Sequence, residues 1–369
     1  MTAPMRMLLV TDAWTPQVNG VVRTLTTTAS ELERMGHSVT VLAPGRRRTL
    51  PCPGYPEIRL TLQPAAAVRE TLSGRRFDTI HIATEGPLGW AARRWCRRHG
   101  LRFTTSYHTR FPEYLRLRAP VPLPLSYALL RRFHGAAART LVRTPTQRRL
   151  LAERGFENLA VWPGGVDTAL FRPVSTGLID LPRPIAVCVG RVAPEKNLDA
   201  FLKLDLPGSK IVVGDGPALE RYRARYGRVH FPGYRHGDEL VRILASADVF
   251  VFPSRTDTLG LVMLEAIACG VPVAAFPVPG PLDIVRDGAN GALDEDLREA
   301  VFRALAVPGD DCVEFARAFT WQRATERFAS LLVPAERPAT GGADPRAYNS
   351  DACTSRRPAP KPVSINPVN

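Results

Sequence analysis

The sequence predicts an α/β protein with two tandem domains, each built on a parallel β-sheet. Its length of 369 residues corresponds to two domains at about 100–200 residues each. Short apolar, β-branched runs alternate with helix-like segments, which is typical of βαβ units. The alternation restarts once, after a stretch rich in Pro, Gly and Ser. These three observations together predict the fold class.

The first domain is expected to span residues 1–172. Its first strand is the apolar run Met7–Thr11. The segment Val22–Met35 that follows is helix-like and ends at Gly36, a residue suited to a helix C-cap. The remaining strands of this domain are expected at residues 38–42, 79–83, 103–107 and 140–142.

The second domain is expected at residues 185–333, after a hinge at residues 173–184. Its strands are expected at residues 185–190, 210–214, 229–231, 248–252 and 271–275. Its last helix, residues 319–332, could pack back on the first domain. Residues 334–369 contain few large apolar side chains and cannot bury enough surface to offset the entropy of ordering, so a disordered tail is expected.

This architecture predicts where a ligand would bind. Doubly wound parallel sheets bind ligands at the carboxyl ends of their strands. If those ends face each other in the two domains, a single cleft results. A nucleotide would suit one side of such a cleft, and its reaction partner would suit the other side.

The net charge of +14 is concentrated in the first domain. Residues 1–172 hold 26 Arg against 11 Asp and Glu, a balance of +15, whereas the remaining residues hold 23 Lys and Arg against 24 Asp and Glu, a balance of −1. Such a split can indicate an anionic partner, either a membrane surface or a nucleic acid. Because the first lysine is Lys196 and Arg, Ala and Pro are abundant, a GC-rich genome explains the same split, and both interpretations stay open.

Cysteine usage and hydropathy predict a cytoplasmic protein. The six cysteines are dispersed without a C-x-x-C motif, which argues against a zinc site and a disulfide framework and favours reduced thiols. No run of about 18 apolar residues is present, so no transmembrane helix is expected. The run Met7–Val10 is too short for the hydrophobic region of a signal peptide.

The segment with the clearest chemical signal follows the expected strand at 248–252. Asp257 and Glu265 stand eight residues apart, and the turn between them begins a helix. The first free amides of that helix lie near Leu261 and Val262, and free amides at a helix N-terminus bind anions. Glu265, about one turn inside the helix, can accept two hydrogen bonds from sugar hydroxyls. The alternative is an acidic turn that only complements the helix dipole.

A second polar group follows the expected strand at 185–190. Arg191 can hold a phosphate with two parallel hydrogen bonds, and Lys196 adds a point charge. In a transfer from a nucleotide donor, the leaving nucleoside diphosphate gains charge in the transition state, and fixed cations lower that barrier. The alternative is an exposed turn with solvated charges.

Three weaker candidates lie in other loops. Gly20, after the first strand, permits close approach of the backbone to a ligand before a helix starts. His108 ends the strand at 103–107 and would face the cleft, where it could orient or polarise a reacting sugar, although a lone histidine is more often structural. Asp215 lies in the turn at 214–217 that closes a strand of the second domain, and it could contact the donor.

Taken together, these stretches resemble glycosyltransferase family 4, whose members have the GT-B architecture of two Rossmann-like domains facing across a cleft. The resemblance covers about residues 5–332 and rests on the order of its motifs. These motifs are LLVTDAWTPQVNGVVRTL, HIATEGPLG, SYHTRFPEYL, GGVDTALFRP, GRVAPEKNL, VVGDGP, ADVFVFPSRTDTLGLVMLEAIACGVPVAA and FTWQRATERF.

The resemblance implies how the donor is held. Arg191 and Lys196 would bind its diphosphate, which the loop at Gly20 would approach from the other domain. Glu265 would bind the ribose. Asp257 stands where the family's first glutamate contacts hydroxyls of the donor sugar.

The resemblance also implies the chemistry. Retaining transfer proceeds on one face of the sugar, and His108 matches a histidine near the reactive carbon. The leaving phosphate would assist deprotonation of the incoming hydroxyl, so no protein nucleophile is named. The family requires no metal, and the nucleotide sugar is a substrate rather than a cofactor.

Two departures from the family pattern matter. The usual E-x7-E motif reads D-x7-E here, at Asp257 and Glu265. A D-T-[LF]-G variant occurs in members resembling mannosyl-, glucosyl- and glucuronosyltransferases, so the donor sugar stays unsettled. The arginine that commonly precedes Gly-Val-Asp is Gly164 here, so any contact made by that arginine is missing.

Residues 110–134 mix cations with bulky apolar side chains. Such a surface could lie at an anionic bilayer, and the alternative is a core-facing helix after a Pro-rich loop.

We expect an enzyme that moves mannose, glucose or glucuronic acid from a GDP- or UDP-sugar to a lipid at the cytoplasmic membrane face. A growing polysaccharide is the alternative acceptor. A nucleic-acid-binding protein is the alternative of another class, although no aromatic RNA-binding signature or helix-turn-helix pattern supports it.

Overall fold

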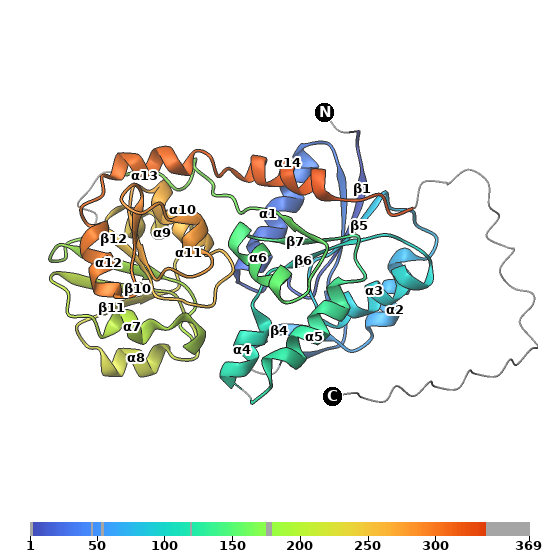
Figure 1. Cartoon of the computed structure of the whole chain (residues 1–369), viewed down its shortest axis with the longest axis horizontal. Helices are drawn as coiled ribbons and strands as arrows, with labels where there is room; N and C mark the ends of the chain where they lie inside the picture. Colours follow the sequence, from blue (N-terminus) through green and yellow to red (C-terminus); the bar gives the residue numbers. More distant parts are fainter. Residues whose placement is uncertain (1–2, 46, 53–54, 119, 175–178, 337–369) are drawn as a thin grey trace, which may run out of the picture. The chain divides into compact units, whose positions relative to one another are not determined.

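The computed structural model describes residues 3–45, 47–52, 55–118, 120–174 and 179–336. Within these ranges the chain forms two six-stranded parallel sheets flanked by helices (Figure 1). The predicted α/β fold class with two parallel sheets is confirmed. The predicted tail beyond residue 336 and residues 175–178 of the predicted hinge lie outside the described residues.

The first sheet organises the N-terminal lobe, which we define as the part of the chain packed around it. Its strand order is β2-β1-β5-β6-β7-β8. The strands are β1 (Arg6–Val10), β2 (Ser38–Leu42), β5 (Thr79–Ile82), β6 (Thr104–Tyr107), β7 (Arg139–Val142) and β8 (Leu159–Val161). The helices are α1 (Gly20–Arg34), α2 (Pro64–Leu72), α3 (Pro87–Arg98), α4 (Phe111–Arg118), α5 (Leu123–His134) and α6 (Pro145–Glu153). An antiparallel hairpin of β3 (Thr49–Cys52) and β4 (Tyr55–Thr61) is added to this lobe.

The second sheet organises the C-terminal lobe in the same way. Its strand order is β11-β10-β9-β12-β13-β14. The strands are β9 (Ile185–Val189), β10 (Ser209–Val213), β11 (His230–Gly233), β12 (Val249–Phe252), β13 (Val273–Ala275) and β14 (Gly291–Leu293). The helices are η1 (Pro194–Lys196), α7 (Leu198–Leu202), α8 (Leu219–Arg225), α9 (Gly237–Ala245), α10 (Leu261–Ala268), α11 (Pro281–Ile284), α12 (Leu297–Ala304) and α13 (Gly309–Ala316).

The last described helix, α14 (Trp321–Leu331), packs in the core of the N-terminal lobe. Its Phe328 is buried against Trp162, with ring centroids 4.5 Å apart. The same apolar cluster contains Met7 and Leu9 of β1. Figure 1 shows α14 lying beside α1. The chain therefore returns to its first lobe after completing the second one.

Asp12, directly after β1, fixes the carboxyl edge of the first sheet. Its buried carboxylate accepts hydrogen bonds from the amide of Leu88 and the hydroxyl of Thr84, both at 3.0 Å. It thereby satisfies the first turn of α3, whose N-cap is Gly86. A Cβ at Gly86 would stand 2.4 Å from the Asp12 carboxyl carbon, so the cap position needs a glycine. Burial raises the pKa of Asp12 despite these hydrogen bonds.

The length and polarity of a helix decide whether it could cross a membrane. Among the residues that the structure describes, no helix combines the length and the apolar character needed to cross a bilayer.

Candidate donor site at the carboxyl ends of the strands

The turn between β12 and α10 is the centre of the candidate site. Gly260 caps α10 in a left-handed conformation, with φ of 80°. A Cβ at Gly260 would stand 2.8 Å from the side chains of Met263 and Phe252, so packing and conformation both require glycine. The helix then begins at Leu261, and Glu265 lies one turn further on.

Lys196 and Asp257 meet at this turn. The Lys196 Nζ lies 2.6 Å from Oδ1 and 2.8 Å from Oδ2 of Asp257. They meet because the loop after β9 is tied to the loop after β12. The Thr256 hydroxyl donates to the Glu195 carbonyl at 3.1 Å, and the Asn197 amide nitrogen donates to the Pro253 carbonyl at 3.0 Å. The structure thus brings together Lys196, predicted to bind phosphate, and Asp257, predicted to bind the donor sugar.

Arg191 and Asp215 lie in adjoining loops after β9 and β10. The Val192 amide donates to the Asp215 carbonyl at 2.9 Å. Gly214 allows these loops to pack backbone against backbone, since a Cβ there would stand 1.9 Å from the Gly190 carbonyl oxygen. The Asp215 carboxylate is exposed and accepts a hydrogen bond from the amide of its own neighbour. Asp215 is therefore placed beside the Arg191 loop.

Glu265 is buried, and it is engaged from the other lobe. One of its carboxylate oxygens accepts a hydrogen bond from the guanidinium of Arg23 on α1. Its Oε2 has no hydrogen-bond partner within the described part of the chain. Burial raises the pKa of Glu265, and the positive charge of Arg23 opposes that shift. Sequence reasoning missed Arg23, although it lies only three residues after Gly20.

Gly20 stands at the first position of α1. The side chain of Asn19 caps this helix, accepting hydrogen bonds from the amides of Val21 at 3.0 Å and Val22 at 2.9 Å. A Cβ at Gly20 would meet no described atom within 4 Å. No neighbour in the described chain therefore forces a glycine here, and the space in front of it is open.

His108 lies at the end of β6, against the same turn as Asp257. Its carbonyl accepts a hydrogen bond from the Thr258 hydroxyl at 2.7 Å. Its ring packs edge-on against Trp162, with centroids 5.6 Å apart. Burial, together with the nearby Arg143, holds the pKa of His108 well below its usual range, so the imidazole is neutral at pH 7. Tyr114, which sequence reasoning did not single out, donates to Asp257 Oδ1 at 3.3 Å.

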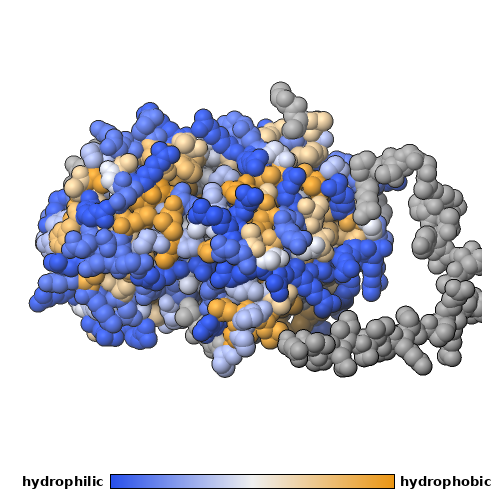
Figure 2. Space-filling view, in the orientation of Figure 1, coloured by the Kyte–Doolittle hydropathy of each residue, from blue (hydrophilic) through white to orange (hydrophobic). Residues whose placement is uncertain are grey.

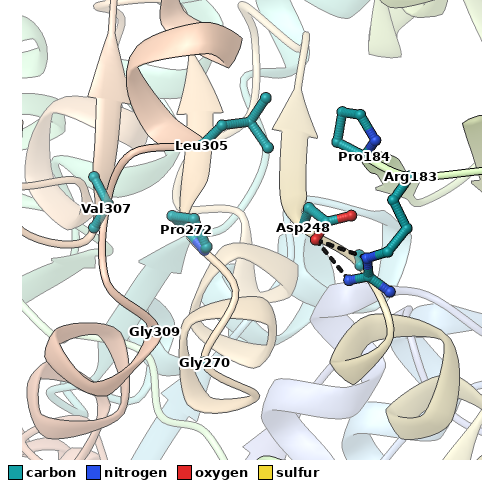
Figure 3. Close-up of a pocket in the computed structure, with 9 residues that line it drawn as sticks. Arg183, Pro184, Asp248, Gly270, Pro272, Leu305, Val307 and Gly309 are labelled. Carbon is teal, nitrogen blue, oxygen red and sulfur yellow. Dashed lines mark hydrogen bonds and ion pairs between the residues drawn. The ribbon is translucent and has the colours of Figure 1, made fainter. Parts of the chain in front are cut away.

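A separate hollow of about 500 Å³ opens at the opposite edge of the second sheet (Figure 3). It lies at the amino ends of β9, β12 and β13. Its lining includes Arg183, whose guanidinium donates to Asp248 at 2.6 Å. Because parallel sheets bind ligands at the carboxyl ends of their strands, we do not assign this hollow to the donor.

No group of three or more His, Cys, Asp or Glu residues in the described ranges is arranged to hold a metal ion.

Comparison with known proteins decides the family. The family model described as Glycosyltransferase Family 4 matches residues 18–170, and that described as Glycosyl transferases group 1 matches residues 183–319. The chain belongs to glycosyltransferase family 4. This membership confirms the resemblance, and the chain is a hexosyltransferase.

Two curated relatives and one solved structure illustrate the family relationship. A GDP-mannose-dependent alpha-mannosyltransferase of Mycobacterium tuberculosis is 30% identical over 315 residues, covering 78% of this chain and 83% of the relative. An alpha-monoglucosyldiacylglycerol synthase of Streptococcus pneumoniae is 27% identical over 351 residues, covering 83% of this chain and 79% of the relative. A sucrose-phosphate synthase of Thermosynechococcus elongatus is 20% identical and superimposes with a TM-score of 0.71 over 88% of this chain and 98% of that structure. The fold of this family 4 enzyme is GT-B, as predicted.

Proposed function

We propose that this family 4 enzyme transfers a hexose, with retention of configuration, from a GDP- or UDP-sugar to a lipid acceptor at the cytoplasmic face of a membrane. One relative is named for its dependence on GDP-mannose, and another for making a monoglucosyldiacylglycerol. The first name supports a nucleotide-sugar donor for this chain, and the second supports a lipid acceptor. The proposal needs no metal or other cofactor.

The donor would bind on the C-terminal lobe. Arg191 and Lys196 would hold its diphosphate, with the free amides of Leu261 and Val262 at the start of α10. Asp257 would release part of its contact with Lys196 and accept hydrogen bonds from sugar hydroxyls. Glu265 would bind the ribose through Oε2, which has no partner in the described chain, while Arg23 keeps its other oxygen.

The transfer would take place on one face of the sugar. The bond from the anomeric carbon to the β-phosphate oxygen breaks, and a bond from the same carbon to the acceptor hydroxyl oxygen forms. The proton of that hydroxyl passes to the departing diphosphate. The neutral ring of His108 would orient the sugar without adding a positive charge beside it. The cations at the turn would stabilise the charge that develops on the diphosphate.

The observation that carries the lipid acceptor is an apolar stripe on α5. Leu125 and Leu129 are 65% and 52% exposed, stand four residues apart on one face, and are followed on that face by the exposed Arg132. The opposite face is buried through Tyr127 and Leu130, among others. Two exposed leucines beside an arginine suit a bilayer surface.

The helix that carries this stripe is connected to the candidate donor site through α4. Helix α5 packs on α4, which carries Tyr114 in contact with Asp257. Phe111, at the start of α4, is also exposed. Figure 2 shows apolar groups beside strongly hydrophilic surface in the region of α4 and α5. An acceptor entering from a membrane surface at α5 would have a short route to the donor sugar.

A panel of GDP- and UDP-sugars tests the donor. A sugar nucleotide that binds the folded protein raises its melting temperature. We expect one base to give the larger shift, and slow release of the matching nucleoside diphosphate when no acceptor is present. Absence of both effects with all GDP- and UDP-sugars would contradict the proposed donor. Faster turnover with a polysaccharide than with diacylglycerol or phosphatidylinositol vesicles would replace the lipid by the alternative acceptor.

A further inference from the structure

Arg143, directly after β7, is a buried cation whose two Nη atoms have no hydrogen-bond partner among the described residues. It is 3% exposed. Its guanidinium carbon lies 4.5 Å from the ring centroid of Trp162. Burial lowers the pKa of Arg143 to about 9, so it is still charged at pH 7. A buried charge without a partner costs free energy, so a function is needed to explain it.

Gly164 shows where this guanidinium lies. A Cβ at Gly164 would stand 3.2 Å from Arg143 Nη2 and 2.8 Å from Leu261 Cδ2. It would also stand 2.4 Å from Leu259 Cδ2. The backbone at Gly164 does not have the positive φ that favours glycine. The glycine therefore leaves space at which Arg143, from the first lobe, meets the beginning of α10, from the second.

The neighbours of Arg143 also have buried atoms without partners. Trp162 Nε1, a donor, and His108 Nε2 have no partner among the described residues. The first turn of α10 receives no hydrogen bond from a capping side chain in the same ranges. A guanidinium, an indole N–H and free helix amides are all donors. Their common complement is an anionic oxygen.

We propose that Arg143 binds an oxygen of the second (β) phosphate of the nucleoside diphosphate in the donor, from the N-terminal lobe, opposite Lys196. The inference rests on the proposed nucleotide-sugar donor. The diphosphate is the source of the oxygen because Arg143 lies beside Leu261, at the helix end where free amides attract the same group. Arg143 is then a donor-binding residue that links the two lobes through the ligand.

The test compares nucleotides with one and two phosphates. Dissociation constants of GDP, GMP, UDP and UMP are measured by calorimetry for the wild type and for Arg143→Met, which keeps an apolar stem on Trp162. We expect the preferred diphosphate to bind about tenfold or more weakly to the variant, and the monophosphate to change by about twofold or less. The melting temperature of the free variant should stay close to that of the wild type, because the removed buried charge had no hydrogen-bond acceptor in the described chain and the methionine side chain keeps the apolar contact with Trp162.

Two further variants make the outcome specific. Arg298→Met is the matched control, since Arg298 also stacks on an aromatic ring, that of Phe302 at 4.9 Å, but lies on α12. It should bind all four nucleotides like the wild type. The double variant Arg143→Met/Gly164→Arg returns a guanidinium to the same space and should recover part of the preference for the diphosphate.

The outcomes separate the inference from the proposed function. If the wild type binds neither GDP nor UDP, the proposed donor is wrong. If it binds one of them and Arg143→Met binds it equally well, the inference is overturned. Equal losses for diphosphate and monophosphate would also overturn it, because the effect would then not lie at the second phosphate. Unchanged nucleotide binding with loss of glycerol 3-phosphate binding would assign Arg143 to an acceptor phosphate instead.

Discussion

At the scale of single residues, the centre of the candidate site is an ion pair between two loops, formed by Lys196 and Asp257. Lys196 is 25% exposed and Asp257 is 14% exposed, so their ion pair is only partly screened by water. The hydrogen bonds from Thr256 and Asn197 fix the two loops that carry them. A diphosphate arriving here would meet a cation whose position is already set. Fixed charges of this kind need little reorganisation during the reaction.

Replacing Lys196 by alanine should therefore reduce catalysis more than stability. We expect kcat to fall by about 10²–10³-fold, the range found when one preorganised donor is removed from a developing anion. The value of kcat is measured from the release of nucleoside diphosphate from the matching sugar nucleotide, and circular dichroism checks that the variant is folded. Lys203→Ala, at the exposed end of α7, is the control and should leave the rate unchanged. A wild-type rate in Lys196→Ala would remove this residue from the donor site.

His81 gives the protein a pH-dependent stability. It is buried in β5, where its two ring nitrogens share hydrogen bonds with Thr104 and Ser106, both at 2.8 Å. Burial lowers the pKa of His81 to about 3 from an ordinary value of 6.5. Below pH 6.5 the unfolded chain binds a proton that the folded chain does not, so stability falls as the pH decreases from 6.5 toward 3.

The contribution of His81 can be measured by substitution. Between pH 7.5 and 5.5, this histidine should account for about 1.4 kcal/mol of the decrease in the free energy of unfolding. Over the same pH interval, we expect the free energy of unfolding of His81→Asn to decrease by about 1.4 kcal/mol less than that of the wild type. Urea unfolding at both pH values measures the two decreases. Comparing each protein with itself separates this effect from any general destabilisation by the substitution. Identical pH dependences would show that His81 is not kept neutral.

Residues of the site differ in how far the sequence could reveal them. Lys196, Asp257 and Glu265 follow strands in short loops or the first turns of a helix, so their place at the sheet edge could be predicted. Their pairing could not, because it depends on how two loops pack. The partner of Glu265, Arg23, is 242 residues away in the chain. Arg143 was missed for the same reason, although Gly164 marked its surroundings as unusual.

At the scale of secondary structure, prediction succeeded where burial was strongest. The expected first helix at Val22–Met35 corresponds to α1, two residues longer at its start because Asn19 caps it. The central strands are continuous apolar runs and were found. The short edge strands β8 and β14, with three residues each, and the β3–β4 hairpin were missed, because edge positions impose little hydrophobic pattern on so few residues.

The exposed stripe of α5 should control membrane binding. Leu125→Glu/Leu129→Glu introduces two anions at the exposed face and leaves the buried face intact. We expect this variant to float with anionic vesicles at least about tenfold less than the wild type while its nucleotide binding is unchanged. Leu282→Glu, on α11 of the other lobe and 47% exposed, is the matched control. Equal flotation of all three proteins would exclude α5 as the membrane surface.

At the scale of the whole molecule, the excess positive charge lies in the first lobe. The balance of +15 lies in residues 1–172, the part that carries α5, whereas Arg191 and Lys196 lie in the part with a balance near zero. Most of the basic side chains on the first lobe, such as Arg131 and Arg132, are exposed. The excess charge therefore suits attraction to an anionic surface more than binding of one nucleotide.

Salt concentration should distinguish attraction to an anionic membrane from binding of the nucleotide. The Debye length decreases from about 10 Å at 0.1 M salt to about 3 Å at 1 M, which screens exposed charges strongly and buried ones much less. We therefore expect flotation with anionic vesicles to fall, at 1 M salt, to the level seen with neutral vesicles. Binding of GDP or UDP should weaken less over the same range, because Arg143 is buried and Lys196 is largely so. If vesicle binding does not change with salt concentration, the excess of arginine in the first lobe would be explained by genome composition. The exposed leucines of α5 would then be the membrane contact.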